Sequence, residues 1–231
     1  MRLTDNPGRV AGLWYLLLVI LGPLRLIYIP EKLFVSGNVA ATVNNIAAHE
    51  LLFRLGIAGD LVGAVVLVLM TLAFYRLFAG VDRSLAVMVV IFGGVMPALL
   101  YFVGVICDLG TLMVVKNADF LLVFDKPQRD ALAMIFLNLH DYTNTAAETL
   151  WGVWLLPLAA LAYRSRFLPR FLGVWLALGG IAWVALSFSA VLWPQYKGVV
   201  YTISQPATIG EMVFALWLAI RGATPPARDE R

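Results

Sequence analysis

The chain has 231 residues, of which 61% are hydrophobic and only 13% are charged. A soluble domain is closer to half apolar and a quarter charged, so the composition excludes a soluble enzyme, a disordered chain and a typical nucleic-acid-binding protein. The single cysteine, Cys107, excludes an intrachain disulfide and a cysteine-rich metal site. The net charge of +3 says less than the positions of the charges, which set the orientation of a membrane protein.

Six apolar stretches reach the length of about 20 residues that a helix needs to cross a membrane. In chain order they cover residues 11–29, 55–78, 85–110, 142–163, 170–192 and 199–221. The first stretch resembles a signal peptide, but it contains Arg25 and lacks a small-residue cleavage site, so we interpret it as a retained span. The sequence therefore predicts an all-α, polytopic six-helix transmembrane bundle. We expect one domain over residues 1–222 and a disordered cytoplasmic tail over residues 223–231.

Lys and Arg residues near the ends of the spans predict the orientation. With the N-terminus inside, ten of them lie on the inner side, and seven lie on the outer side or within the first span. The inner loops, 79–84 and 164–169, are short, and their basic residues are all arginine. Both termini are therefore expected in the cytoplasm, which agrees with an even number of spans.

Two longer segments on the predicted outer side have helical patterns of their own. Asn38 is a plausible N-cap for an amphipathic stretch over residues 38–54, whose apolar residues Val39, Val43, Ile46 and Leu52 recur at helical spacing. In segment 116–141, Asp125 and Pro127 form a helix start, so the helix of the fourth span is expected to begin near residue 127. Both segments are expected to cap the outer face of the bundle in the interface.

Charged residues inside the apolar stretches are the main candidates for function. Arg25, Asp60 and Glu148 each lie 16 residues from an arginine at the inner boundary of the membrane. This spacing places all three at one level, about 24 Å from that boundary. Glu211 lies 10 residues from Arg221, or about 15 Å, close to the middle of the membrane. Because a charge at the bilayer centre costs at least about 2.5–3.5 kcal/mol, these groups should face the interior of the bundle. Arg25 is expected to form an ion pair with Asp60 or Glu148. The carboxyl group that Arg25 does not pair with is then either protonated or bound to a cation.

The fourth span also has a polar face, because His140, Asn144 and Glu148 recur at a spacing of four residues. Asp108 and His140 are expected near the outer interface. These residues, together with His49 and Asp60, predict a polar funnel that opens outward. The candidate ligand-binding residues are Arg25, Asp60, Asn144, Glu148, Glu211 and His140. A purely structural role is the alternative for the buried charges, and simple surface exposure is the alternative for His49 and His140.

Familiar catalytic motifs are absent from the sequence. It contains no phosphate-binding loop, no Gly-x-Ser-x-Gly turn and no His-Glu-x-x-His motif. Two histidines are too few for a three-histidine zinc site. A mixed metal site built from His49, His140, Asp108 and Glu148 stays open as an alternative, and no cofactor is expected.

Several segments together resemble a bacterial family of multispan membrane proteins. They are 12–23 (GLWYLLLVILGP), 28–33 (YIPEKL), 52–61 (LFRLGIAGDL), 154–158 (WLLPL) and the pair Gly210–Glu211. With them the chain resembles the domain of unknown function 4386 family over residues 9–221. The resemblance implies a bacterial inner-membrane protein, and it supplies neither an activity nor catalytic residues. Arg54, Asp60, Glu148 and Glu211 belong to the pattern by resemblance only.

Three functions fit these observations. The first is a binding protein or transporter that holds a small polar, cationic or lipid-headgroup ligand in the outer funnel. The second is a membrane-embedded, metal-assisted hydrolase that acts on lipid. The third is an assembly subunit whose polar cluster is only structural. Apart from the lipid bilayer and such a ligand no partner is predicted, and nucleic acid is excluded.

Overall fold

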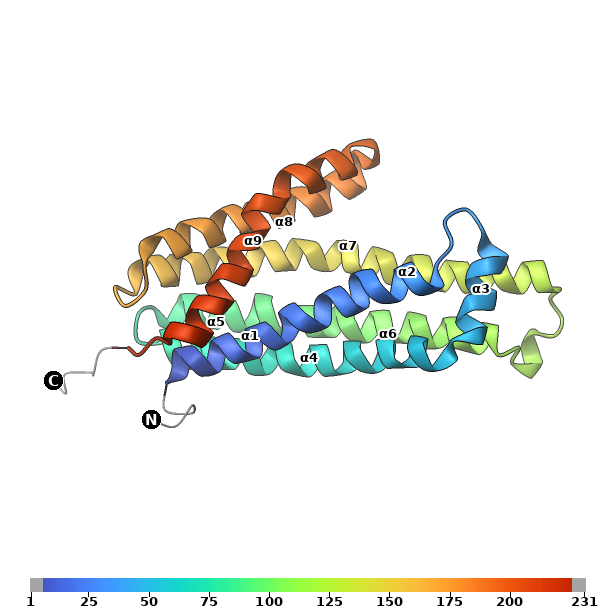
Figure 1. Ribbon diagram of the computed structural model, residues 1–231, viewed down its shortest axis with the longest axis horizontal. Coiled ribbons are helices and arrows are strands. Elements are labelled where there is room, and N and C mark those ends of the chain that lie inside the picture. The colour runs from blue at the N-terminus through green and yellow to red at the C-terminus, as the bar shows by residue number, and fades with distance from the viewer. Residues whose placement is uncertain (1–5, 226–231) are drawn as a thin grey trace. The chain divides into compact units, whose positions relative to one another are not determined.

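The computed structural model describes residues 6–225, and in this range all regular secondary structure is helical (Figure 1). The elements in chain order are α1 (Pro7–Pro23), η2 (Leu24–Tyr28), α2 (Ile29–Leu33), α3 (Val39–Ala48), α4 (Glu50–Phe78), α5 (Arg83–Val90), η3 (Ile91–Val95), α6 (Met96–Val115), η4 (Asp119–Leu121), α7 (Lys126–Arg164), α8 (Arg170–Leu192), η5 (Pro194–Tyr196) and α9 (Lys197–Arg221). The segments η2 and η3 are π-helical, and η4 and η5 are short 3₁₀ helices.

Six helical stretches are long and apolar enough to cross a membrane, which confirms the predicted number of spans. They are Pro7–Leu33, Glu50–Phe78, Arg83–Val115, Lys126–Arg164, Arg170–Leu192 and Pro194–Arg221. The chain is thus a multi-pass membrane protein of the all-α class. The third stretch extends beyond its predicted limit through the apolar residues 111–115, and the fourth begins at Lys126, in the more polar segment before residue 142.

By its internal contacts the chain divides into two compact units. Unit 1 comprises the chain up to Val19, Val65–Ala98 and the chain from Thr145 onward. Unit 2 comprises Ile20–Ala64 and Leu99–Asn144. Long helices such as α4 and α7 therefore contribute to both units. The single domain over residues 1–222 stays a prediction.

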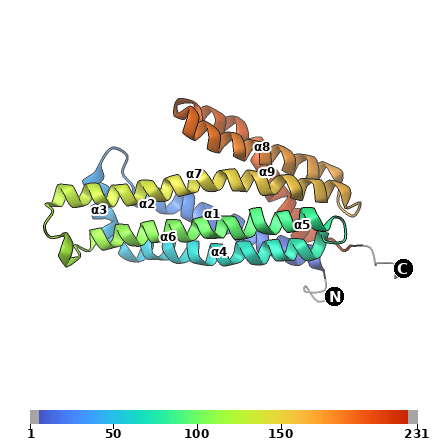
Figure 2. The same ribbon diagram turned by 180° about the vertical axis from the view of Figure 1, so that it is seen from behind.

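Unit 1 contains the antiparallel pair α8 and α9, drawn in orange and red, which lie side by side in both views (Figures 1 and 2). An aromatic cluster fills its core, where Phe74 lies 5.8 Å from Tyr15, 6.2 Å from Trp154 and 6.0 Å from Phe214 between ring centroids. Beyond α9, the backbone N–H of the buried Ala223 donates to the Asn6 side chain at 2.9 Å. The rest of the predicted tail, from residue 226, lies outside the described residues.

Unit 2 is built around apolar side chains from α2, α3, α4, α6 and α7. Its main core contains Ile29, Leu33, Ile46, Phe53, Ile57, Val105, Leu112 and Leu137. The predicted N-cap is confirmed, because the Asn38 side chain accepts a hydrogen bond from the backbone N–H of Ala41 at 2.9 Å. The predicted start of the fourth helix is confirmed as well, with Asp125 accepting from the backbone N–H of Gln128 at 2.9 Å. These caps fix where the polar outer segments become helical.

Both π-helical segments lie immediately upstream of a proline. In η2 the backbone N–H of Ile29 bonds to the carbonyl of Leu24, and Pro30 follows. In η3 the backbone N–H of Met96 bonds to the carbonyl of Ile91, and Pro97 follows. A proline has no N–H and its ring clashes with the carbonyl four residues earlier, so one extra residue in the turn relieves the clash. Single π-turns are frequent at functional sites, and η2 carries Arg25.

Candidate functional site

Arg25 is the centre of a charged network within unit 2. Its Nε donates to Asp60 Oδ2 at 2.8 Å, and its Nη2 donates to Asp108 Oδ2 at 2.5 Å. The Arg25 side chain is 12% exposed and that of Asp108 is 1% exposed. Three different helical segments supply the three groups, namely η2, α4 and α6. The guanidinium therefore links them through two charge-assisted hydrogen bonds, the strongest kind in proteins.

His140 of α7 completes the network, and its neighbours define its tautomer. Arg25 Nη2 lies 3.0 Å from His140 Nε2, and an arginine can only donate, so Nε2 accepts. His140 Nδ1 then carries the hydrogen and donates to the backbone carbonyl of Gly104 at 3.1 Å. This close approach needs a glycine, because a Cβ at position 104 would lie 3.0 Å from the imidazole. The pattern describes a histidine that lies between Arg25 and the backbone of α6 and orients the arginine.

One oxygen of Asp108 is buried and accepts no hydrogen bond among the described residues. This atom is Oδ1, which lies 3.3 Å from His140 Nδ1, although the Nδ1 hydrogen is directed to Gly104. A buried acceptor without a donor carries a desolvation penalty of about 1–3 kcal/mol. The carboxylate of Asp108 therefore keeps an acceptor position that the described residues leave unused.

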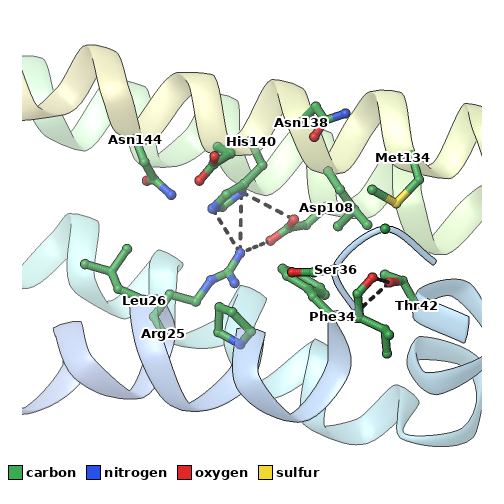
Figure 3. A pocket seen from close by; sticks show the side chains of 15 residues that line it. Arg25, Leu26, Phe34, Ser36, Thr42, Asp108, Met134, Asn138, His140 and Asn144 are labelled. Atoms are coloured by element: carbon green, nitrogen blue, oxygen red, sulfur yellow. Dashed lines mark hydrogen bonds and ion pairs between the residues drawn. The ribbon is translucent and has the colours of Figure 1, made fainter. Parts of the chain in front are cut away.

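A pocket of about 330 Å³ lies beside this network, within unit 2 (Figure 3). Its polar wall contains Arg25, Asp108, Asn138, His140, Asp141 and Asn144. Its apolar wall contains Leu26, Pro30, Phe34, Met134 and Leu137, and the turn 34–37 between α2 and α3 also lines it. Figure 3 shows Arg25 pointing from the blue helix toward His140 on α7, with Asp108 beside them. The volume is at the lower end of the range of small-molecule sites.

Acidic groups outnumber basic groups at this pocket. Arg25 is bonded to Asp60 and Asp108, and the residues that line the pocket include two carboxylates, Asp108 and Asp141. The formal charges of Arg25, Asp60 and Asp108 sum to −1. The arrangement suits a positively charged ligand more than an anion, even though an arginine lies in the wall.

Several predicted site residues meet in unit 2. The expected pair of Arg25 with Asp60 is present, and Asn144 lines the pocket. The placement of Asp108 near the outer interface stays a prediction; in the structure Asp108 bonds to Arg25, and α6 continues seven residues beyond it to Val115. His140 is also enclosed, with a side chain that is 12% exposed. The remaining histidine, His49, is exposed as the surface alternative expected.

The other two candidates belong to unit 1. Glu211 accepts hydrogen bonds from Tyr15 Oη and from Trp183 Nε1, each at 2.5 Å. Glu148 lies on α7, and one of its carboxylate oxygens is buried. A role for either residue in binding a ligand stays a prediction.

A metal site is the remaining chemical alternative in unit 2. Ligand atoms of Asp60, Asp108 and His140 all lie within 4.8 Å of one another. This group shares Asp108 and His140 with the predicted set, but it contains Asp60 in place of His49 and Glu148. The guanidinium of Arg25 already bonds to all three of these side chains. A metal ion would have to displace a cation that is tethered to the chain, so the arrangement fits an ion-pair network better than a metal centre.

Comparison with known proteins places the chain in a family. The model of the family described as domain of unknown function 4386 (DUF4386) matches residues 10–222. The chain belongs to this family. No curated protein and no solved structure matches it. The predicted resemblance is confirmed over almost the whole chain, and the function has to be argued from the site.

In this DUF4386 member, sequence reasoning missed part of the pocket wall. Met134, Asn138 and Asp141 precede Asn144 on α7 at intervals of three and four residues. This is the spacing of one helical face, and it was available in the sequence. The partners of Glu211 had no such signal, because Tyr15 is 196 residues away along the chain.

Proposed function

We propose that the chain is a membrane protein that binds a small molecule with a positively charged ammonium group in the pocket of unit 2. The observation that carries this proposal is Asp108 Oδ1, a buried carboxylate oxygen in the pocket wall that accepts no hydrogen bond among the described residues. An ammonium group supplies both the missing N–H donor and the missing positive charge.

The chemistry of the wall supports a ligand with two unlike ends. The lining combines polar side chains such as Asp108, Asp141 and Asn144 with apolar ones such as Phe34 and Met134. An amine with a short apolar or glycerol-like extension matches this combination. The free amine and the headgroup of an aminophospholipid share this chemistry, and both are sources of the ligand that an experiment has to distinguish.

The predicted orientation gives the pocket a side of the membrane. With both termini in the cytoplasm, the turn 34–37 and the loop between α6 and α7 are on the outer side. Under the proposal, the protein takes its ligand from the outer leaflet or the external solution of a bacterial inner membrane. Transport of the ligand across the membrane is the extended form of the same proposal.

The proposal is tested by binding to the purified protein in nanodiscs of uncharged lipid. The probes are ethanolamine, lysophosphatidylethanolamine, glycerol and inorganic phosphate. Binding of each probe is measured by the shift in Tm and by calorimetry. Ethanolamine is expected to raise Tm, more strongly at low salt, whereas glycerol and phosphate are expected to leave it unchanged. If only the lysolipid binds, the source is a lipid headgroup.

Two variants and a control complete this test. Asp141→Asn and Asp108→Asn are each expected to weaken amine binding at least about tenfold, as the loss of one charged hydrogen bond implies. Glu50→Gln is the matched control, since Glu50 is an acid of unit 2 that bonds to Arg54 and Lys116. Equal binding of phosphate and amine, or unchanged affinity in both Asp variants, contradicts the proposal.

The cluster of Asp60, Asp108 and His140 supports a second candidate, a metal-assisted hydrolase that acts on lipid. It requires stoichiometric Zn²⁺ or Mn²⁺ in purified protein and a lipid-cleaving activity that a chelator removes. Arg25→Gln is informative here, because it removes the competing cation and should strengthen metal binding. The wild-type protein and the variant are incubated with Zn²⁺ and then examined by elemental analysis. If neither contains bound metal, this candidate is rejected.

A further inference from the structure

Glu211 forms a second polar site, in unit 1 and separate from the residues of the pocket. It lies on α9, ten residues before the end of that helix at Arg221. Trp183 Nε1 on α8 donates to Glu211 Oε1 at 2.5 Å, and Tyr15 Oη on α1 lies 2.5 Å from Glu211 Oε2. Both oxygens of the carboxyl group thus have a specific partner, supplied by a different helix in each case.

The partners of Glu211 are neutral and are themselves packed in aromatic surroundings. Tyr15 is buried, and its ring centroid lies 5.8 Å from that of Phe74 and 5.7 Å from that of Trp154. The ring of Trp183 meets Trp151 edge to face at 5.2 Å. An ionised carboxylate in a membrane span is costly unless it is paired with a cation, and two neutral donors do not supply one.

The hydrogen-bonding capacities of these groups are compatible with a carboxylic acid. The indole N–H can only donate, so Oε1 is an acceptor and acts as the carbonyl oxygen. Tyr15 Oη donates to Oε2 when the carboxyl group is ionised. A phenol can also accept, so this bond reverses when Oε2 carries the hydrogen and donates it to Tyr15 Oη. Among the described residues, the Tyr15 phenol is the titratable group that contacts Glu211.

We propose that Glu211 is a proton-binding site of unit 1, in which the carboxylic acid is held by Trp183 and Tyr15. Its ligand is a proton. It is also a site for modification by an apolar carbodiimide, because this reagent partitions into membranes and reacts with protonated carboxyl groups. The carboxyl proton passes to one carbodiimide nitrogen while Oε2 bonds to the central carbon. Migration of the acyl group to nitrogen then gives a stable N-acylurea that contains every atom of both reactants.

Carbodiimide labelling provides the first test. Purified protein in nanodiscs is treated with dicyclohexylcarbodiimide near neutral pH, and the modified peptides are mapped by mass spectrometry. The peptide that contains Glu211 is expected to gain the mass of one whole reagent molecule, and Glu211→Gln is expected to lose this label. The ion-paired acid Glu50 serves as the internal control and is expected to stay unmodified.

Infrared spectroscopy tests the same proposal without depending on access of the reagent. The carbonyl band of a protonated carboxylic acid is expected in the wild-type protein near neutral pH and absent from Glu211→Gln. The matched variant Glu50→Gln should lose intensity only from the carboxylate bands. Tyr15→Phe should shift the acid band of Glu211 to higher frequency, because it removes the hydrogen-bond acceptor.

The infrared result decides the proposal whatever the labelling shows. If Glu211→Gln removes carboxylate bands and leaves the acid region unchanged, Glu211 is ionised and the proposal is wrong. This outcome is independent of the pocket in unit 2, because none of the variants used here changes a residue of the pocket wall.

Discussion

Asp108 is the residue whose loss should most disturb the network of unit 2. Asp108→Asn keeps the size of the side chain and removes one of the two carboxylates that balance the buried Arg25. Removing a partner from a buried pair costs about 3–5 kcal/mol when nothing else compensates, and because Asp60 remains we expect the lower part of this range. The measurement is the free energy of unfolding in detergent, followed by circular dichroism during titration with a denaturing detergent.

The control for this prediction is an ion pair of the exposed kind. Arg164 Nη1 lies 3.5 Å from Asp82 Oδ2, and both side chains are accessible. Asp82→Asn keeps an oxygen that can cap α5 at Leu85 and is expected to cost less than about 1 kcal/mol. Equal effects of the two substitutions would mean that burial does not strengthen the network around Arg25.

Part of this network could be predicted from the sequence alone. Arg25 and Asp60 lie at equal distances from basic residues at the inner boundary, so depth alone was enough to suggest that they pair. The contact between Arg25 and Asp108 could not be predicted in this way, because the two residues are 83 positions apart along the chain and no local pattern relates them.

Close packing of α7 on α8 within unit 1 depends on two glycines. A Cβ at Gly152 would lie 2.4 Å from the carbonyl oxygen of Gly180, a contact with backbone that cannot move aside without separating the helices. Gly152→Ala is therefore expected to lower the free energy of unfolding by about 1–3 kcal/mol. In a membrane, where small residues at helix contacts contribute much of the packing, the loss should be clear in the unfolding midpoint.

Gly59→Ala is the matched control, because a Cβ at Gly59 meets nothing within 4 Å. Alanine has the higher helix propensity by about 1 kcal/mol, so this variant should be as stable as the wild type or slightly more stable. A destabilised Gly59→Ala together with an unchanged Gly152→Ala would contradict the described packing.

At the level of elements, local signals and long-range contacts differed in how far they could be predicted. The N-cap at Asn38 and the helix start at Asp125 depend on residues within three positions and were predictable. The π-turn η2 depends on Pro30, and a proline indicates a disturbed helix without specifying the hydrogen-bond pattern. The contact between Glu211 and Trp183 depends on how α8 and α9 pair, which no local pattern in the sequence encodes.

On the scale of the whole molecule, the distribution of basic residues predicts which loops face the cytoplasm. Two glycines allow a direct test, because Gly80 lies in a predicted inner loop and Gly198 lies at the start of α9 on the predicted outer side. A Cβ at either position meets nothing within 4 Å, so a cysteine is accommodated without strain. The native Cys107 is buried, and Cys107→Ala removes it as a background signal.

In intact cells of a bacterial host, with the outer membrane made permeable, a membrane-impermeant maleimide is expected to label Gly198→Cys and not Gly80→Cys. After the inner membrane is opened, both variants should react, which controls for the exposure of each thiol. The physical reason is the greater number of Lys and Arg residues on the predicted inner side, since short loops rich in these residues are retained in the cytoplasm. The reverse labelling pattern would place both termini outside. It would also move the pocket of unit 2 to the cytoplasmic side, so that its ammonium ligand would come from the cell interior.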